Sequence, residues 1–175
     1  MEEIFDVYTR DGKYLGTKSK SFCHSENPGV YHKPVWVWAI NSKKEILVQQ
    51  RAAHKKSNPN KWDMAVAGHT RAGEKLVEAA IRETFEELGI NTKEEDYEFL
   101  FEYCYQPGWE LAQVYLLKTD ALVKDMTLSE REVSEARWLP FNEFNELLYS
   151  DDFAPHLMDF RDKISGSIKE YIKKN

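Results

Sequence analysis

The chain has 175 residues, of which 42% are hydrophobic and 31% charged, and its formal net charge is -6. That length suits one domain with its own hydrophobic core, so we expect a single domain over residues 1–175. The negative charge disfavours nucleic-acid polymers and anionic membranes as partners. No apolar run is long enough to span a bilayer and the N-terminus is acidic, unlike a signal peptide, so we expect a cytoplasmic protein.

The first part of the chain predicts β structure. Residues 5–17 predict a β-hairpin, because Asp11-Gly12 at its centre tolerates the positive φ angles of a tight turn. Aromatic and β-branched residues then predict further strands, separated by polar or Pro-containing loops. These strands are expected at residues 35–40, 46–51 and 62–67, with the second paired to the first.

Residues 73–88 predict an amphipathic helix. Gly73 is the expected N-cap, and Gly89 suits the left-handed residue that often ends a helix. Side chains at helical spacing predict one buried stripe, which consists of Val77, Ile81, Thr84 and Leu88.

The second half of the chain predicts three strands and then two helices. The strands are expected at residues 97–105, 111–118 and 136–139, and the helices at residues 141–149 and 152–171. Strands and helices in this mixture, around a central hairpin, favour an α/β sandwich over a doubly wound parallel sheet.

Three glutamates on the helix over residues 73–88 suggest chemistry. Glu83, Glu86 and Glu87 stand at i, i+3 and i+4, so they share one face, which we expect to lie away from the buried stripe. Like charges about 6 Å apart repel by roughly 1–3 kcal/mol per pair near a protein surface. A divalent cation removes this repulsion, and oxygen ligands favour Mg²⁺ or Mn²⁺. The alternative is an ordinary solvated acidic helix face.

The spacing of this segment resembles the signature of the Nudix hydrolases. The matching positions lie within residues 68–90 and are Gly68, Glu74, Arg82, Glu83, Glu86, Glu87 and Gly89. They stand in a loop that leads into an amphipathic helix, which is the context that the signature needs. The resemblance implies the Nudix fold, an α/β/α sandwich around a mixed β-sheet. Thr84 is a departure, since the family usually has an aliphatic residue there.

The resemblance also implies a role for the matched residues. Glu83, Glu86 and Glu87 would bind Mg²⁺ or Mn²⁺, and either Glu83 or Glu87 would act as the general base. Arg82 would pair with a neighbouring carboxylate and keep the helix face rigid. Gly68 would let backbone approach the metals and the diphosphate, and Glu74 would steady the junction between loop and helix. Two further candidates for substrate contact are Arg51 and His69.

A looser similarity links residues 5–140 to the Nudix branch that includes isopentenyl-diphosphate isomerases. Those isomerases carry a catalytic cysteine one residue before the glycine that matches Gly68, but this chain has Ala67. Alanine cannot protonate an alkene, so the isomerase reaction lacks its central acid. Four residues fall near the metal-binding positions of the isomerase: His24, His32, His69 and Glu110. Whether they form a second metal site is left open.

These observations favour a metal-dependent hydrolase of nucleoside diphosphates linked to another moiety. Three alternatives stay open: an isopentenyl-diphosphate isomerase, a Nudix-fold binding protein without catalysis, and a hydrolase of a non-nucleotide diphosphate. The expected partner is a small diphosphate substrate, and a homodimer is left open. Product analysis separates the alternatives, because they give phosphate-bond cleavage, double-bond migration or binding without turnover.

Overall fold

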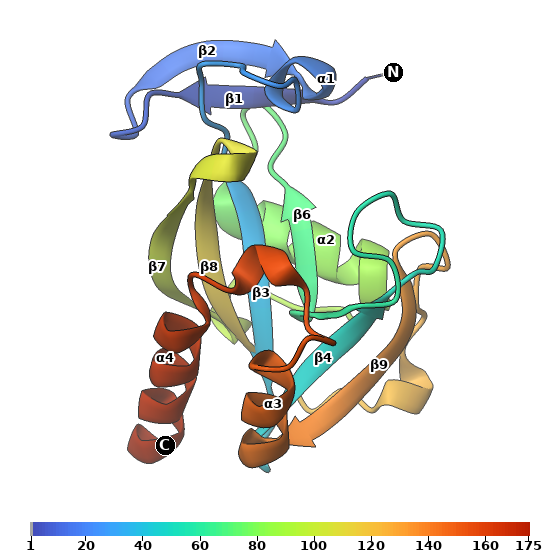
Figure 1. Cartoon of the computed structure of the whole chain (residues 1–175). Helices are drawn as coiled ribbons and strands as arrows, with labels where there is room; N and C mark the ends of the chain where they lie inside the picture. The colour runs from blue at the N-terminus through green and yellow to red at the C-terminus, as the bar shows by residue number, and fades with distance from the viewer. Residues whose placement is uncertain (1) are drawn as a thin grey trace.

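A computed structural model of the chain, described here for residues 2–175, centres on a seven-stranded mixed sheet (Figure 1). The strand order is β5-β4-β3-β8-β7, with β6 paired to β3 and β9 paired to β4. Only the pairing of β3 with β8 is parallel among the pairs of this sheet in residues 2–175. The strands are β3 (Pro34–Ile40), β4 (Glu45–Arg51), β5 (Trp62–Asp63), β6 (Val66–His69), β7 (Tyr97–Tyr105), β8 (Glu110–Lys118) and β9 (Val133–Pro140).

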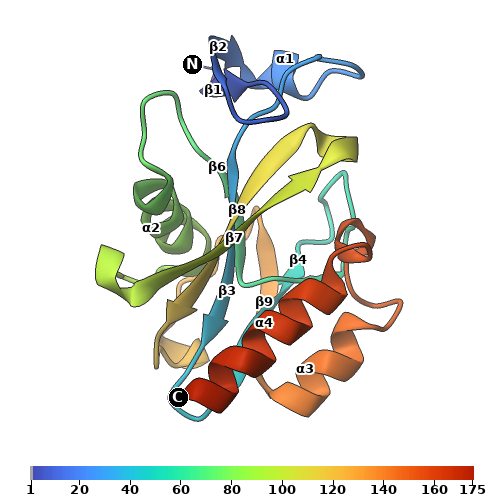
Figure 2. The same cartoon turned by 90° about the vertical axis from the view of Figure 1, so that its left-hand side faces the viewer.

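Helices cover both faces of this sheet. Helix α2 (Leu76–Leu88) lies on one face, and helices α3 (Phe141–Leu148) and α4 (Arg161–Lys174) lie on the other (Figure 2). The predicted α/β/α sandwich is therefore confirmed. Short 3-10 turns connect the elements: η1 (Glu94–Asp96), η2 (Gln106–Gly108), η3 (Val123–Asp125) and η4 (Pro155–Leu157).

Strand β3 carries the core on both of its faces, because all seven of its residues are buried. Successive side chains of a strand point to opposite faces of the sheet. Trp36, Trp38 and Ile40 accordingly pack in the cluster with α3 and α4. Val35, Val37 and Ala39 pack in the cluster with α2. This double burial explains why the segment reads as one uninterrupted apolar run.

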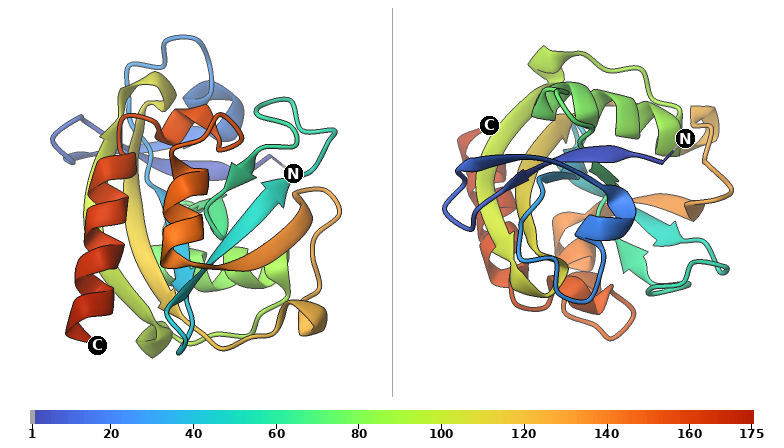
Figure 3. Two further views of the ribbon diagram at one scale, coloured as in Figure 1. Left: turned by 60° about the horizontal axis from the view of Figure 1, so that its bottom comes forward. Right: turned by 90° about the horizontal axis from the view of Figure 1, so that it is seen from above.

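The N-terminal hairpin forms a separate two-stranded sheet of β1 (Ile4–Tyr8) and β2 (Tyr14–Ser19), followed by the short helix α1 (Lys20–Cys23). It lies across one end of the main sheet (Figure 3). Gly12 in its turn has a φ of 84°, as the Asp11-Gly12 pair predicts. The Ala72 amide donates a hydrogen bond to the Ile4 carbonyl at 2.8 Å, which ties the hairpin to the loop before α2.

Three predicted boundaries are wrong, and each has a local cause. The segment 62–67 is two strands, because β5 pairs with β4 whereas β6 pairs with β3. The helix expected from Gly73 begins at Leu76, since Gly73 has a left-handed φ of 75°. The strand expected at residues 136–139 extends over the whole of β9.

The last helix begins later than the predicted range 152–171. The Trp62 amide donates to the Asp152 carbonyl and the Ala154 amide donates to the Trp62 carbonyl, so this stretch is held against β5. Pro155 and its neighbours then form η4, and α4 starts only at Arg161. Within residues 2–175, no helix has both the length and the apolar character needed to cross a membrane.

Candidate active site

A cleft of about 1180 Å³ opens at the end of the sheet where β6 leads toward α2. Its lining comes from distant parts of the chain: Glu3 before β1, α1, β3, the loop after β4, β6, α2, and the segments around residues 105–110, 129–132 and 156. Gly68, Glu83, Glu86 and Glu87 all line it, so the glutamates of α2 open into this cleft.

The three glutamates differ in burial. The Glu86 side chain is 48% exposed and that of Glu83 is 12% exposed, whereas Glu87 as a residue is only 5% exposed. The sequence predicted that all three glutamates lie on a face away from the buried stripe, and this prediction is wrong for Glu87. Helix α2 buries Ala79, Ala80, Thr84, Glu87 and Leu88, while Val77 and Ile81 stay partly exposed. The helix is thus rotated so that one edge of the carboxylate cluster enters the protein.

Arg82 holds the glutamates of this region together. Its Nε donates to Glu74 Oε1 at 2.8 Å, its Nη2 to Glu74 Oε2 at 2.9 Å and its Nη1 to Glu83 Oε1 at 2.7 Å. Nη2 also donates to the His69 carbonyl at 2.8 Å. Burial opposes the charge of Arg82, but its hydrogen bonds with Glu74 and Glu83 raise its pKa. A bidentate pair of this kind fixes geometry as well as charge.

Gly68 is required by the position of Glu83. A Cβ atom at residue 68 would lie 2.1 Å from the Cδ atom of Glu83, far inside contact distance. The amide of His69 donates to Glu83 Oε1 at 3.2 Å, so the same turn both makes room for the carboxylate and binds it. Burial raises the pKa of Glu83, and Arg82 opposes this rise.

Glu87 has one protein partner for its buried carboxylate among the hydrogen bonds of residues 2–175. Gln49 Nε2, from β4, donates to Glu87 Oε2 at 3.0 Å. Burial raises the pKa of Glu87 well above its ordinary value, although the Gln49 amide opposes the rise. A buried carboxylate with so little compensation is costly as an anion. The site therefore provides a place where an added positive charge would stabilise the protein.

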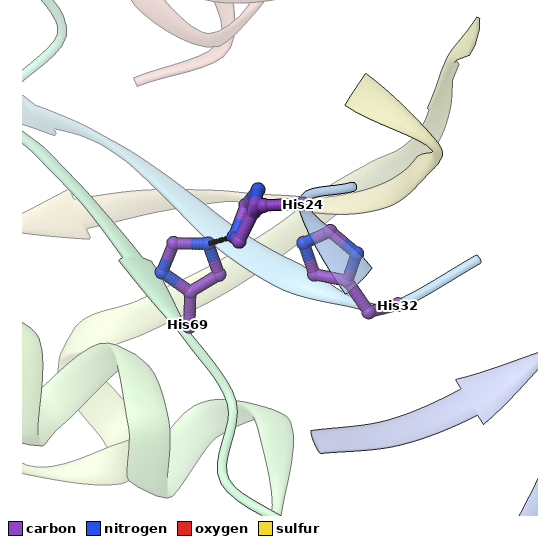
Figure 4. Close-up of side chains that lie close together, drawn as sticks. All are labelled: His24, His32 and His69. Atoms are coloured by element: carbon purple, nitrogen blue, oxygen red, sulfur yellow. Dashed lines mark hydrogen bonds between the residues drawn. The ribbon is translucent and has the colours of Figure 1, made fainter. Parts of the chain in front are cut away.

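Three histidines meet beneath the hairpin (Figure 4). His24 follows α1, His32 precedes β3 and His69 ends β6, and they place one nitrogen each within 4.8 Å of the others. The Nε2 atoms of His24 and His69 are 3.0 Å apart. The ring of Phe5 stacks on His69 at 4.9 Å between centroids and on His32 at 5.4 Å, so the hairpin closes the cluster.

His32 is the buried member of this cluster. Both of its ring nitrogens lack a hydrogen-bond partner in the described chain, and Glu110 Oε1 lies 3.8 Å from its Nε2. Burial, reinforced by the neighbouring His24, lowers the pKa of His32 to about 4. Its imidazole is therefore neutral near pH 7, which is the form that binds metals. Burial also raises the pKa of Glu110 to about 8.

Arg51, a candidate for substrate contact, lines the cleft but is already engaged. Its Nη1 donates to Asp63 Oδ2 at 3.3 Å, and its Nε donates to the Ser57 carbonyl at 3.1 Å. Asp63 is only 1% exposed, so this ion pair lies inside the protein. The arrangement fixes the loop that follows β4 along one side of the cleft.

The structure also brings residues to the cleft that sequence reasoning missed. Tyr105 from the end of β7 and His156 from η4 both line it. These residues lie far apart in the chain, and no spacing rule connects them. Gln49 had a weak signal as a polar residue within an otherwise apolar strand.

Comparisons with known proteins find relatives of one family. The family model of the NUDIX domain matches residues 30–159. A Nudix hydrolase of Listeria monocytogenes is 33% identical over 129 residues, which cover 74% of this chain and 75% of that protein. Nudix hydrolase 3 of Arabidopsis thaliana is 32% identical over 165 residues, which are 87% of this chain but only 21% of the plant protein. Isopentenyl-diphosphate isomerases are among the other relatives.

Solved structures share the fold. The crystal structure of DR0079 from Deinococcus radiodurans has a TM-score of 0.72 to this chain at 19% sequence identity. The match covers 96% of this chain and 98% of that one, including the hairpin end of the molecule as well as the sandwich.

Proposed function

The chain belongs to the Nudix family, and we propose that it hydrolyses the diphosphate linkage of a nucleoside diphosphate joined to another group, with Mg²⁺ or Mn²⁺ as its cofactor. The observation that carries this proposal is the carboxylate cluster of α2, which opens into the cleft and in which Arg82 pairs with Glu83 and Glu86. The chain's relatives include proteins named Nudix hydrolases. Four residues of the signature, Gly68, Glu83, Glu86 and Glu87, line the cleft.

The donor set of α2 fits a hard divalent cation. Glu83, Glu86 and Glu87 offer carboxylate oxygens only, which Mg²⁺ and Mn²⁺ prefer, and among residues 2–175 Glu87 has no cationic partner. When bound there, the cation would neutralise the diphosphate and lower the pKa of a coordinated water. These three glutamates are therefore the proposed ligands.

The remaining chemistry falls to residues of the chain. Glu83 or Glu87 accepts the proton of the attacking water, and burial raises the pKa of both toward the range of a useful general base. Arg82 is a positioning residue, because it holds Glu83 and Glu74 in place. Gly68 lets the diphosphate approach the backbone beside Glu83.

Ala67 separates this proposal from isomerase activity. It lines the cleft directly before Gly68, where the isomerase reaction would need an acid. We therefore expect no double-bond migration in isopentenyl diphosphate. Deuterium incorporated into that substrate by the wild-type protein in deuterated water would contradict the proposal. Wild type and Ala67→Cys are to be compared side by side.

The histidine cluster of His24, His32 and His69 is proposed as a second metal site, because the two buried nitrogens of His32 have no hydrogen-bond partner in the described part of the chain. Imidazole ligands suit Zn²⁺ and other transition metals better than Mg²⁺. Calorimetric titration of the chelator-treated protein with Zn²⁺ should show a high-affinity site in wild type that is lost in His32→Asn. His54→Asn, an exposed histidine outside the cluster, is the matched control.

The reaction itself is tested by metal dependence and isotope labelling. The substrates to assay are a panel of nucleotide sugars and dinucleoside polyphosphates. Their hydrolysis should stop in chelator and return with Mg²⁺ or Mn²⁺. It should not return with Ca²⁺, because the looser coordination geometry of Ca²⁺ positions water poorly. In ¹⁸O-water the label should enter a phosphate product. Label on carbon, or turnover that chelator leaves unchanged, would contradict the proposal.

A further inference from the structure

Gln49 of β4 carries a buried amide directly behind the carboxylate cluster of α2. The residue is 4% exposed, and it is not one of the described residues that line the cleft. Leu47, two positions earlier, packs in the core cluster with α2, and alternate residues of a strand share a face, so Gln49 also points toward α2. Strand β4 is paired on both sides here, because Gln49 stands beside Asp63 of β5 and Ala136 of β9. The sheet therefore holds the backbone of Gln49 in place.

The chemistry of the amide determines how it faces Glu87. Gln49 Nε2 donates to Glu87 Oε2 at 3.0 Å. An ionised carboxylate only accepts hydrogen bonds, so the NH₂ end of the amide must face it. Oε1 is then left buried, and it has no hydrogen-bond partner in the described part of the chain. A buried oxygen without a partner costs free energy, so the amide is a poor filler of the core, and what it provides is the bond to Glu87.

The carboxylates of α2 have two different kinds of partner. Arg82, a cation, pairs with Glu83 and Glu86. Glu87 instead accepts from a neutral amide, and within residues 2–175 no cation pairs with it. A neutral donor fixes a carboxylate oxygen in position without cancelling its charge. Glu87 thus keeps the full negative charge that attracts a divalent cation, although its orientation is already set.

We propose that Gln49 is a positioning residue, whose amide holds the Glu87 carboxylate in the orientation that binds the metal ion. This inference rests on the proposed function, because it adds a residue behind the proposed ligands of α2. Gln49 acts only through Glu87 and contacts neither metal nor substrate. Groups that hydrogen-bond to a metal ligand typically change metal affinity or activity by about 10–100-fold when they are removed.

Metal binding without substrate is the first test. The chelator-treated protein is titrated with Mg²⁺ in a calorimeter, and because imidazoles bind Mg²⁺ poorly, the titration reports on the α2 carboxylates rather than on the histidine cluster. Gln49→Met keeps the length of the side chain but removes the donor, so it should weaken Mg²⁺ binding about tenfold. An affinity equal to that of wild type would overturn the proposal.

The chain offers a closely matched control for this variant. Gln113 of β8 is also 4% exposed, and its Nε2 donates to Glu102 Oε2 at 2.6 Å. It is therefore a second buried glutamine of the sheet that donates to a glutamate, but it is not among the described residues that line the cleft. Gln113→Met should keep the Mg²⁺ affinity of wild type. An equal loss of affinity in Gln113→Met and Gln49→Met would show a general effect of burial and overturn the proposal.

Steady-state kinetics at saturating Mg²⁺ separate positioning from substrate contact. Gln49→Met should lower kcat about tenfold and leave KM for the substrate nearly unchanged. A rise in KM at unchanged kcat would show contact with the substrate and overturn the proposal. In a Glu87→Gln background, Gln49→Met should lower kcat by less than about twofold, because the residue through which it acts is already altered. A further tenfold loss in that background would show that Gln49 acts by another route.

These tests also separate this inference from the proposed function. If the wild-type protein hydrolyses no diphosphate, the proposed function fails, while the Mg²⁺ titration of Gln49→Met still decides the role of Gln49. If the protein hydrolyses a diphosphate and Gln49→Met matches wild type in Mg²⁺ affinity and kcat, the proposed function stands and this inference is wrong. Thermal unfolding establishes that each variant is folded, and Gln49→Leu replaces Gln49→Met if the latter is not.

Discussion

The carboxylate cluster of α2 and the histidine cluster beneath the hairpin are built in opposite ways. Glu83, Glu86 and Glu87 come from one short stretch of one helix, and Arg82 of the same helix pairs with Glu83 and Glu86. His24, His32 and His69 come from three separate segments and meet only when the hairpin docks. The first cluster depends on local spacing and the second on tertiary structure.

Burial acts on the two clusters with opposite sign. It raises the pKa of Glu83 and Glu87 and lowers the pKa of His32 and His69. In both cases it disfavours the charged form, because a charge loses solvation when it leaves water. The comparison teaches that each cluster costs free energy without a ligand. The carboxylate cluster needs a positive charge, and the histidine cluster needs a partner for its ring nitrogens.

The largest expected effect concerns the carboxylates. Glu86→Gln or Glu87→Gln keeps the side-chain shape but removes a metal-binding charge, so kcat should fall by more than about 100-fold. Glu78→Gln, on an exposed position of the same helix that does not line the cleft, should keep its activity. Steady-state assays at saturating Mg²⁺ measure the difference. Full activity in Glu86→Gln would remove that residue from the site.

The next effect concerns the fit between Gly68 and Glu83. Gly68→Ala places a methyl group where Glu83 now lies, so the carboxylate must move and turnover should drop by about 100-fold. Gly166→Ala is the matched control, because no atom of residues 2–175 lies within 4 Å of its added Cβ and it stands inside α4. That control should gain about 0.5–1 kcal/mol of stability. Unchanged activity in Gly68→Ala would show that the position of Glu83 is not critical.

The opposite signs of burial predict opposite pH dependences in the metal-free protein. Folded His32 has a pKa of about 4, below the ordinary value of 6.5, so the unfolded state binds protons more readily and the free energy of unfolding falls as pH decreases from 6.5. At pH 5 this amounts to about 2 kcal/mol, which His32→Asn should relieve. Urea unfolding in chelator at several pH values measures this.

Glu87 should behave in the reverse sense. Its folded pKa lies well above the ordinary value of 4.5, so the unfolded state releases its proton first and the free energy of unfolding falls as pH rises above 4.5. Glu87→Gln should therefore gain stability relative to wild type as pH rises. A stability difference between these two proteins that does not vary with pH would contradict the buried position of this carboxylate.

The smallest expected effect concerns Thr84, on the buried face of helix α2. Thr84, the departure from the family pattern, is fully buried, and its Oγ1 accepts a hydrogen bond from the Tyr97 hydroxyl at 2.8 Å. Thr84→Val removes this acceptor and should cost about 1 kcal/mol of unfolding free energy while activity persists. Thermal unfolding and kinetics of one preparation test both parts. A large loss of activity would show that this face also serves the reaction.

Sequence reasoning succeeded where the cause is local. The apolar run of β3, the Asp11-Gly12 turn and the fixed spacing around Arg82 depend on neighbours in the chain, so the strands, the hairpin and the signature could be predicted. The rotation of α2 could not, because the small residues Ala79 and Ala80 pack closely on the sheet and displace the expected stripe. His156 was missed because its position also depends on tertiary structure. Backbone hydrogen bonds between Trp62 and the segment 152–154 hold the chain just before η4, and this places His156 at the cleft.

The parallel pairing of β3 with β8 has a consequence for how the chain reaches this structure. Val35 of β3 pairs with Gln113 of β8, so this pairing joins residues that lie far apart in the sequence. Closing so long a loop lowers the conformational entropy of the chain before many contacts form. Proteins whose contacts are mostly between residues distant in sequence therefore fold more slowly. We therefore expect slow folding, in the range of milliseconds to seconds, during which the apolar faces of β3 stay exposed to aggregation.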